Sequence, residues 1–132
     1  MLWTESLTTG VRKIDELHRE FFDRLHSLME DDLCSRGSPE ESLDLVEICA
    51  MAFFDEEQRL HEAYEYPRAE SHKIQHDGYL NAFRRVKGKL ISEGLTLANV
   101  LAFNRCAVEC IKRHILEHDR DFAEYCKMQA DL

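Results

Sequence analysis

Two pairs of residues in the middle of the chain have the spacing of metal ligands on helices. Glu57 and His61 are four residues apart, and so are His72 and His76. Residues four apart lie on one face of a helix, one turn from each other. Pro67 separates the two pairs, so they belong to different helices. Either pair alone is a weak signal, because surface helices often carry such pairs by chance, but together they direct one carboxylate and three imidazoles toward one point.

Polar side chains in two further helices are expected at the same level. His18 occupies a core position in an apolar stripe that begins at Val11 and continues past Leu25 at alternating spacings of three and four. The alternative for His18 is a buried neutral imidazole that is hydrogen-bonded to a neighbour. His114 lies beside the apolar seam of the last helix, and Asp119 is expected just past the end of that helix.

The apolar patterning predicts an all-α protein, an up-down-up-down antiparallel four-helix bundle. Ser38 is the expected N-cap of the second helix, Pro67 precedes the third, and Gly94 ends the third. The polar core positions are early in the first and third helices and late in the second and fourth, so an antiparallel bundle brings them to one end. The residues expected to line the core are Val11, Ile14, His18, Phe21, Leu25 and Leu28; Leu43, Val46, Ala50, Phe53, Glu57 and Leu60; His72, His76, Tyr79, Phe83, Val86 and Leu90; and Leu97, Leu101, Asn104, Val108, Ile111 and Ile115.

Glu57 is the most informative of these polar positions. It falls in the middle of the apolar stripe of the second helix, and a buried carboxylate is costly unless it is paired or bound to a cation. Nitrogen and oxygen donors from four helices therefore favour a metal site. Because no thiolate is among the donors, the expected metal is iron, with manganese or zinc as alternatives.

Composition sets the broad class of the protein. The chain has 132 residues and a formal net charge of −9, which argues against a nucleic-acid partner. It has no run of about 18 apolar residues that would span a membrane and no signal-peptide pattern at its start, so we expect a cytoplasmic protein or a domain of a larger one. The 5 cysteines are expected to be reduced, with Cys106 and Cys110 as small buried apolar residues.

A set of residues spread over all four expected helices carries a family resemblance. They are Trp3, Thr9-Gly10-Val11, Ile14-Asp15, His18, Phe54, Glu57, Tyr66-Pro67, His72-Lys73-Ile74-Gln75-His76, His114-Ile115 and Asp119. In these residues the chain resembles the bacterial hemerythrins, a hemerythrin-like family, over nearly its whole length, which implies a single hemerythrin-like domain over residues 1–132. The resemblance implies a non-heme diiron site in which His72, His76 and His114 bind one iron. The other iron would take His18 and one more histidine, and Glu57 and Asp119 would bridge the two.

One position departs from the family pattern. Phe53 stands where the family has the second histidine of the second iron. His61 is a candidate replacement, although eight residues of helix separate it from Phe53, roughly 12 Å of rise. Three arrangements are open. In the first, His61 reaches a metal from the other side of Glu57. In the second, the second metal is held by His18, the two carboxylates and water; in the third, one metal is bound and Phe53 fills core space. His118 is a further candidate ligand, more readily placed toward solvent.

The missing histidine bears on function. The leading hypothesis is a di-metal protein that binds dioxygen or another small diatomic or peroxide ligand, and extra water-filled positions favour turnover over reversible carriage. The alternatives are a metal-dependent oxidase or peroxide-reactive enzyme, and an oxygen, redox or metal sensor that acts through a partner. Whether the chain is an enzyme is left open, and the sequence indicates no particular redox partner. A ferritin-like oxidase is disfavoured because no Glu-x-x-His motif occurs, and a bundle with an empty, degenerate site conflicts with Glu57 in the core.

Overall fold

The computed structural model describes residues 3–27, 39–94 and 96–130, and all regular secondary structure in these ranges is helical, with no strand among them. The prediction of an all-α protein is confirmed. The elements are η1 (Glu5–Leu7), α1 (Arg12–Ser27), α2 (Pro39–Ala63), α3 (Ala69–Glu93), α4 (Leu97–Asn104), η3 (Arg105–Glu109), α5 (Cys110–His114), η4 (Ile115–Asp119) and α6 (Arg120–Ala130). The predicted N-cap Ser38, the core position Leu28 and the cysteine Cys34 lie outside the described residues.

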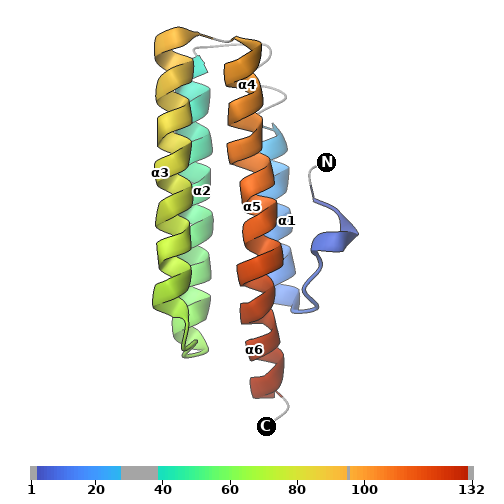
Figure 1. Ribbon diagram of the computed structural model, residues 1–132. Coiled ribbons are helices and arrows are strands. Elements are labelled where there is room, and N and C mark those ends of the chain that lie inside the picture. Colours follow the sequence, from blue (N-terminus) through green and yellow to red (C-terminus); the bar gives the residue numbers. More distant parts are fainter. Residues whose placement is uncertain (1–2, 28–38, 95, 131–132) are drawn as a thin grey trace.

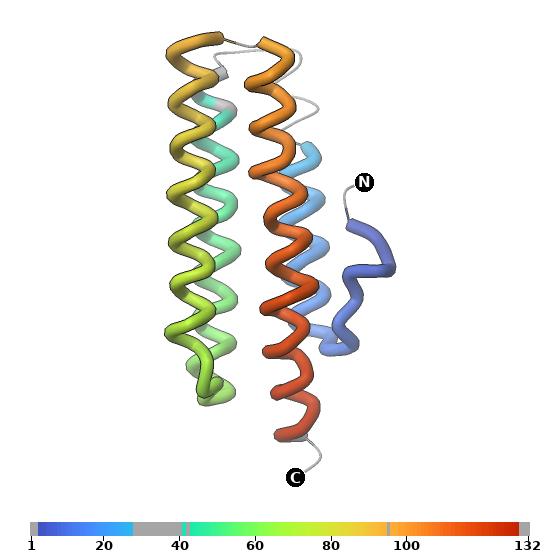
Figure 2. Tube along the Cα trace, viewed as in Figure 1, coloured from blue at the N-terminus to red at the C-terminus, as the bar shows by residue number. Residues whose placement is uncertain are grey.

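Four rods of helix lie side by side (Figure 1). Helices α2 and α3 pack together along their length, α1 packs against α2, and the segments from α4 to α6 follow one another as one long rod. Figure 2 shows that the start of α1 and the turn between α2 and α3 lie at the same end, the lower end in this view. The histidines near these helix ends therefore lie at a similar height in the bundle.

Short signals in the sequence set the helix boundaries. Gly94 follows α3 with φ 91°, a left-handed conformation that a residue without Cβ adopts readily, and the predicted end of this helix is confirmed. Between α2 and α3, Glu65 takes φ 51° and the Tyr66 amide donates to the His61 carbonyl at 2.9 Å. Before α1, the Asp15 carboxylate accepts three hydrogen bonds from Thr9 and Gly10, which fixes the N-terminal lead-in on the bundle.

The fourth rod differs from the predicted stripe. Leu97, Leu101 and Asn104 were expected to face the core, but all three are exposed, while Asn99 and Phe103 are buried. The cause is the π-helical segment η3, in which one extra residue per turn rotates the buried face. After it the prediction holds, since Val108, Ile111 and Ile115 are buried. The helix also continues to Ala130, so Asp119 lies within it and not past its end.

The remaining predicted core is largely observed. The expected apolar positions of α1 and α2, from Ile14 to Phe53, are buried, and Trp3 packs with the same core cluster. Cys106 is buried as predicted, whereas Cys110 is half-buried. Among the described residues no helix is long and apolar enough to cross a membrane; a cytoplasmic location stays a prediction.

Candidate metal centre

Each helical rod supplies side chains to one buried cluster. His18 comes from the second turn of α1, and Glu57 from the last turns of α2. His72 and His76 come from the first two turns of α3, where the spacing of four places both rings on the inner face. The fourth rod contributes His114 at the end of α5 and Asp119 at the end of η4. All six side chains are buried, with 0–7% of each residue exposed.

Five of these side chains converge on one point. One ligand atom from each of Glu57, His72, His76, His114 and Asp119 lies within 4.8 Å of all the others. Glu57 Oε2 is 3.1 Å from His72 Nε2 and 2.9 Å from His76 Nε2. Asp119 Oδ1 is 2.8 Å from His72 Nε2 and 3.0 Å from His114 Nε2.

The spacing of the three imidazole nitrogens fits one metal ion. His114 Nε2 lies 2.9 Å from His72 Nε2 and 3.1 Å from His76 Nε2. Donors at right angles around an ion with bonds of about 2.1 Å are about 3.0 Å apart, whereas tetrahedral donors are about 3.4 Å apart. Both observed distances are therefore in the range expected for nitrogen donors that share one ion.

His18 forms a second half of the cluster on the other side of the carboxylates. His18 Nε2 is 2.8 Å from Asp119 Oδ2 and 3.6 Å from Glu57 Oε1. Each carboxylate thus directs one oxygen toward the three histidines and its other oxygen toward His18. The two carboxylates therefore lie between His18 and the three histidines.

Several buried polar atoms in the cluster lack hydrogen-bond partners among the described residues. They include Glu57 Oε1 and Asp119 Oδ1, although the latter is close to two imidazole nitrogens. Unpaired carboxylate oxygens are costly in a protein interior, and a cation would satisfy both. The side chains present therefore fit a bound metal better than they fit a network of hydrogen bonds.

Two known proteins are similar to this chain in sequence. Myohemerythrin of Theromyzon tessulatum is 28% identical over 97 residues, which cover 73% of this chain and 76% of the relative. Bacteriohemerythrin of Clostridium acetobutylicum is 25% identical over 130 residues, which cover 93% of this chain and 98% of the relative. The chain is hemerythrin-like. No family model matches it, and no solved structure matches it.

Phe53 lies on the His18 side of this hemerythrin-like centre. Its ring centroid is 5.6 Å from that of His18 and 4.6 Å from that of Phe21, and only 3% of the residue is exposed. An apolar ring thus stands beside the half of the cluster that has a single imidazole. It supplies packing and excludes water there, but it has no atom that binds a metal.

His61 lies on the opposite side of Glu57, next to the three-histidine half. Its ring is 4.3 Å from His72 and 4.4 Å from Phe122, and 1% of the residue is exposed. The described structure does not include it in the five-residue cluster. Neither ring nitrogen has a hydrogen-bond partner among the described residues. Burial, followed by the nearby His72, lowers the pKa of His61 to about 4, so this imidazole is neutral.

The second π-helical segment explains why Asp119 faces the cluster. His114 and Asp119 are five residues apart, and the π-helical turn η4 aligns residues at this spacing on one face. An α-helical turn would instead have aligned His118 with His114. His118 is half-buried, with its ring 5.4 Å from that of His114, so the structure places it beside the cluster and not within it.

Charge within the cluster is balanced between carboxylates and imidazoles. Burial opposes the charge of His18 most strongly, but hydrogen bonds with Asp119 and Glu57 outweigh it and raise its pKa to about 9. The pKa of His114 rises to about 10 against burial, through the charge of Asp119 and hydrogen bonds with both carboxylates. Burial favours the neutral form of Asp119, and so does the charge of Glu57, yet the imidazoles lower its pKa to about 2.

Two supporting contacts were not predicted from the sequence. Phe54 stacks on His76 with centroids 4.0 Å apart, and the Gln58 amide lies 3.5 Å from His76 Nδ1. A ligand imidazole is commonly oriented through its second nitrogen in this way. The sequence signal for the second contact was Gln58, a polar residue directly after Glu57 on the side of α2 that meets α3.

Proposed function

We propose that the chain is a non-heme di-metal protein, with iron as the metal, that binds dioxygen or a related small ligand within a single hemerythrin-like domain. The observation that carries this proposal is the division of the two carboxylates, each with one oxygen toward the three histidines and one toward His18. The up-down-up-down order of the four rods, in which α1 and α3 run against α2 and the α4 to α6 rod, belongs to the same proposal.

Each metal position has its own donors. The three converging imidazoles of His72, His76 and His114 would hold one metal, with an oxygen from each carboxylate. His18 and the remaining oxygens of Glu57 and Asp119 would hold the other. When bound, iron supplies a coordination position for a small ligand and the electrons to reduce it.

Phe53 lowers the number of protein donors at this second metal position. The protein places one nitrogen and two carboxylate oxygens there, and the Phe53 and Phe21 rings form the adjoining wall. Fewer protein donors leave more positions for solvent or an incoming ligand. This supports ligand turnover, as in an oxidase or a peroxide-reactive enzyme, as the second candidate function beside reversible binding.

The position of His61 favours the arrangement with His18 and solvent over one in which His61 is a ligand. Its ring adjoins His72, while the position left by the missing histidine adjoins His18. We propose that His61 remains a neutral imidazole at the edge of the three-histidine half. Because its two nitrogens are unpartnered among the described residues, metal ligation by His61 is the competing hypothesis.

The test is the metal content of protein purified without air, together with its absorption spectrum before and after air is admitted. Two irons per chain and a visible band that appears with air and persists would support dioxygen binding, and a band that decays would support turnover. Glu57→Ala should lose at least one metal, whereas Glu62→Ala, an exposed carboxylate on the same helix, should lose none. Full metal content in Glu57→Ala would contradict the bridging role.

A further inference from the structure

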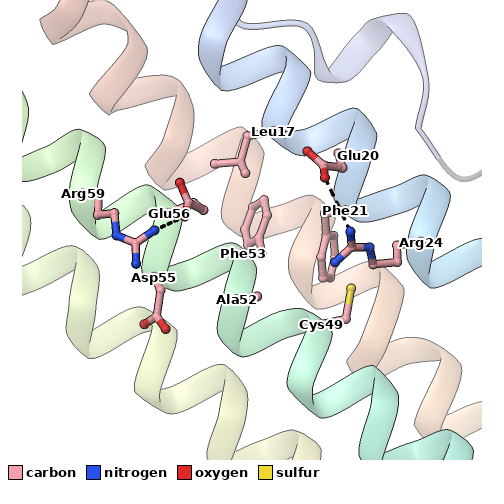
Figure 3. A pocket seen from close by; sticks show the side chains of 10 residues that line it. All are labelled: Leu17, Glu20, Phe21, Arg24, Cys49, Ala52, Phe53, Asp55, Glu56 and Arg59. Carbon is pink, nitrogen blue, oxygen red and sulfur yellow. Dashed lines mark hydrogen bonds and ion pairs between the residues drawn. The ribbon is translucent and has the colours of Figure 1, made fainter.

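A groove opens between α1 and α2 directly outside the His18 half of the cluster. Its volume is about 410 Å³. Figure 3 shows the side chains around it, with Leu17, Phe53 and Phe21 in the middle and charged side chains toward the two flanks. Ala52 and Cys49 of α2 complete the lining toward one end.

The middle of the groove is apolar, and its inner wall adjoins His18 of the candidate metal centre. Phe53 lines the groove, and the same ring packs against His18 at 5.6 Å between centroids. Phe21 packs against Phe53 at 4.6 Å and also lines the groove. Phe53 is therefore in contact with the groove and with the imidazole of the second metal position. This one side chain therefore lies between the groove and His18.

The charges beside the groove are already paired. Arg59 forms an ion pair with Glu56 one turn away on α2, and Arg24 lies 3.6 Å from Glu20 on α1. Asp55 adds one more negative charge to the lining. No free cationic group among these residues would attract an anion, and the apolar middle favours an uncharged molecule.

A second, smaller hollow lies on the opposite half of the centre. Its volume is about 230 Å³, and Tyr79, Ala82 and His114 are among its lining residues. It reaches the metal position that already has three imidazoles and two carboxylate oxygens. The α1–α2 groove instead reaches the position with one imidazole, where fewer protein atoms occupy the coordination sphere.

We propose that the α1–α2 groove is the access route for a small uncharged ligand of the dioxygen or nitric oxide class, and that the Phe53 ring is the barrier at its inner end. This inference rests on the proposed function, because it assumes that the ligand binds at the His18 half. A barrier on the route changes the association and dissociation rates by the same factor and leaves the equilibrium affinity unchanged.

The experiment uses Ala52→Trp, which fills the groove from an exposed position, and Ala82→Trp, at a half-buried position, as the control in the second hollow. Nitric oxide is mixed with the reduced iron-loaded protein, and its association and dissociation are followed by absorption. We expect Ala52→Trp to slow both rates at least fivefold with unchanged affinity and iron content, and Ala82→Trp to change neither rate. Phe53→Leu should speed both.

The opposite results separate the two proposals. Slowing in Ala82→Trp alone, or equal rates in all variants of a protein that binds nitric oxide, would overturn the route and leave the proposed function intact. An iron-loaded parent protein that binds no nitric oxide would overturn both. A metal-free readout is xenon binding followed by NMR: the Leu17 methyl groups should shift with xenon in the parent and not in Ala52→Trp, and no shift in the parent would overturn the apolar route.

Discussion

Metal loading should release protons from the cluster. Without metal, the two buried carboxylates are ionised, and the protons that balance them reside on His18 and His114, whose pKa values are about 9 and 10. At pH 7, which is below both pKa values, both imidazoles carry their protons. Coordination requires each nitrogen to be free of its proton, so we expect loading at pH 7 to release about two protons per chain.

The directions of the pKa shifts of His18 and Asp119 predict how the stability of the metal-free protein depends on pH. The raised pKa of His18 stabilises the fold fully below its ordinary value of 6.5, and this contribution is lost as the pH rises through about 9. The lowered pKa of Asp119 contributes above its ordinary value of 3.8, and this contribution is lost as the pH falls through about 2. Metal affinity should rise by about two logarithmic units per pH unit near neutrality.

The assay is the loading of metal-free protein in weak buffer without air, with the protons released measured by potentiometric back-titration. Asp119→Asn should release about one proton fewer, because an imidazolium loses its carboxylate partner. Glu117→Gln, an exposed carboxylate in the same helical segment, should release as many as the parent. Loading without proton release would refute the assignment of charged imidazoles to the metal-free cluster, and an undiminished release in Asp119→Asn would refute their pairing with this carboxylate.

Phe53→His should raise the metal content of the second position, because it adds a nitrogen donor beside His18; elemental analysis with unchanged content would contradict the role assigned to Phe53. His61→Ala should retain the metal content and absorption spectrum of the parent, and loss of a metal would identify His61 as a ligand. Asp15→Ala removes three hydrogen bonds and should lower the free energy of unfolding by about 2–3 kcal/mol in urea titrations. The adjacent Glu16→Ala, which breaks an exposed ion pair, should cost less than about 1 kcal/mol.

Much of the fold follows from local rules of sequence. The spacing of apolar residues predicts the first three helices, and Gly94 marks an end that the structure confirms. Glu57 in the middle of an apolar stripe indicates a polar centre, since few other arrangements make a buried carboxylate tolerable. The meeting of these helices at one level follows from where the polar residues lie along each helix.

The fourth rod shows where such rules fail. A regular period of 3.6 residues assigned Leu97 and Leu101 to the core and offered His118 as a partner of His114. Two π-helical segments change the phase, so those leucines are exposed and Asp119 faces inward. Residue preferences do not predict an extra residue in a helical turn. Such a turn depends on tertiary packing around it and occurs frequently at functional sites. The conformation of Phe53 likewise depends on neighbours from α1 that its own segment does not reveal.

The number of residues in the π-helical turn η4 decides whether Asp119 faces the cluster. Asp119 reaches the cluster because five residues, and not four, complete the turn that begins after His114. Deleting one residue between them would let an ordinary α-helical turn form and would bring the aspartate back to the inner face one residue earlier. Because α6 begins directly after Asp119, the same deletion would leave the buried face of α6 in place and would shift this helix by about 1.5 Å along its axis. The effect of the extra residue is therefore local: the aspartate and the helix that follows it keep their inward faces together, whether the turn has five residues or four.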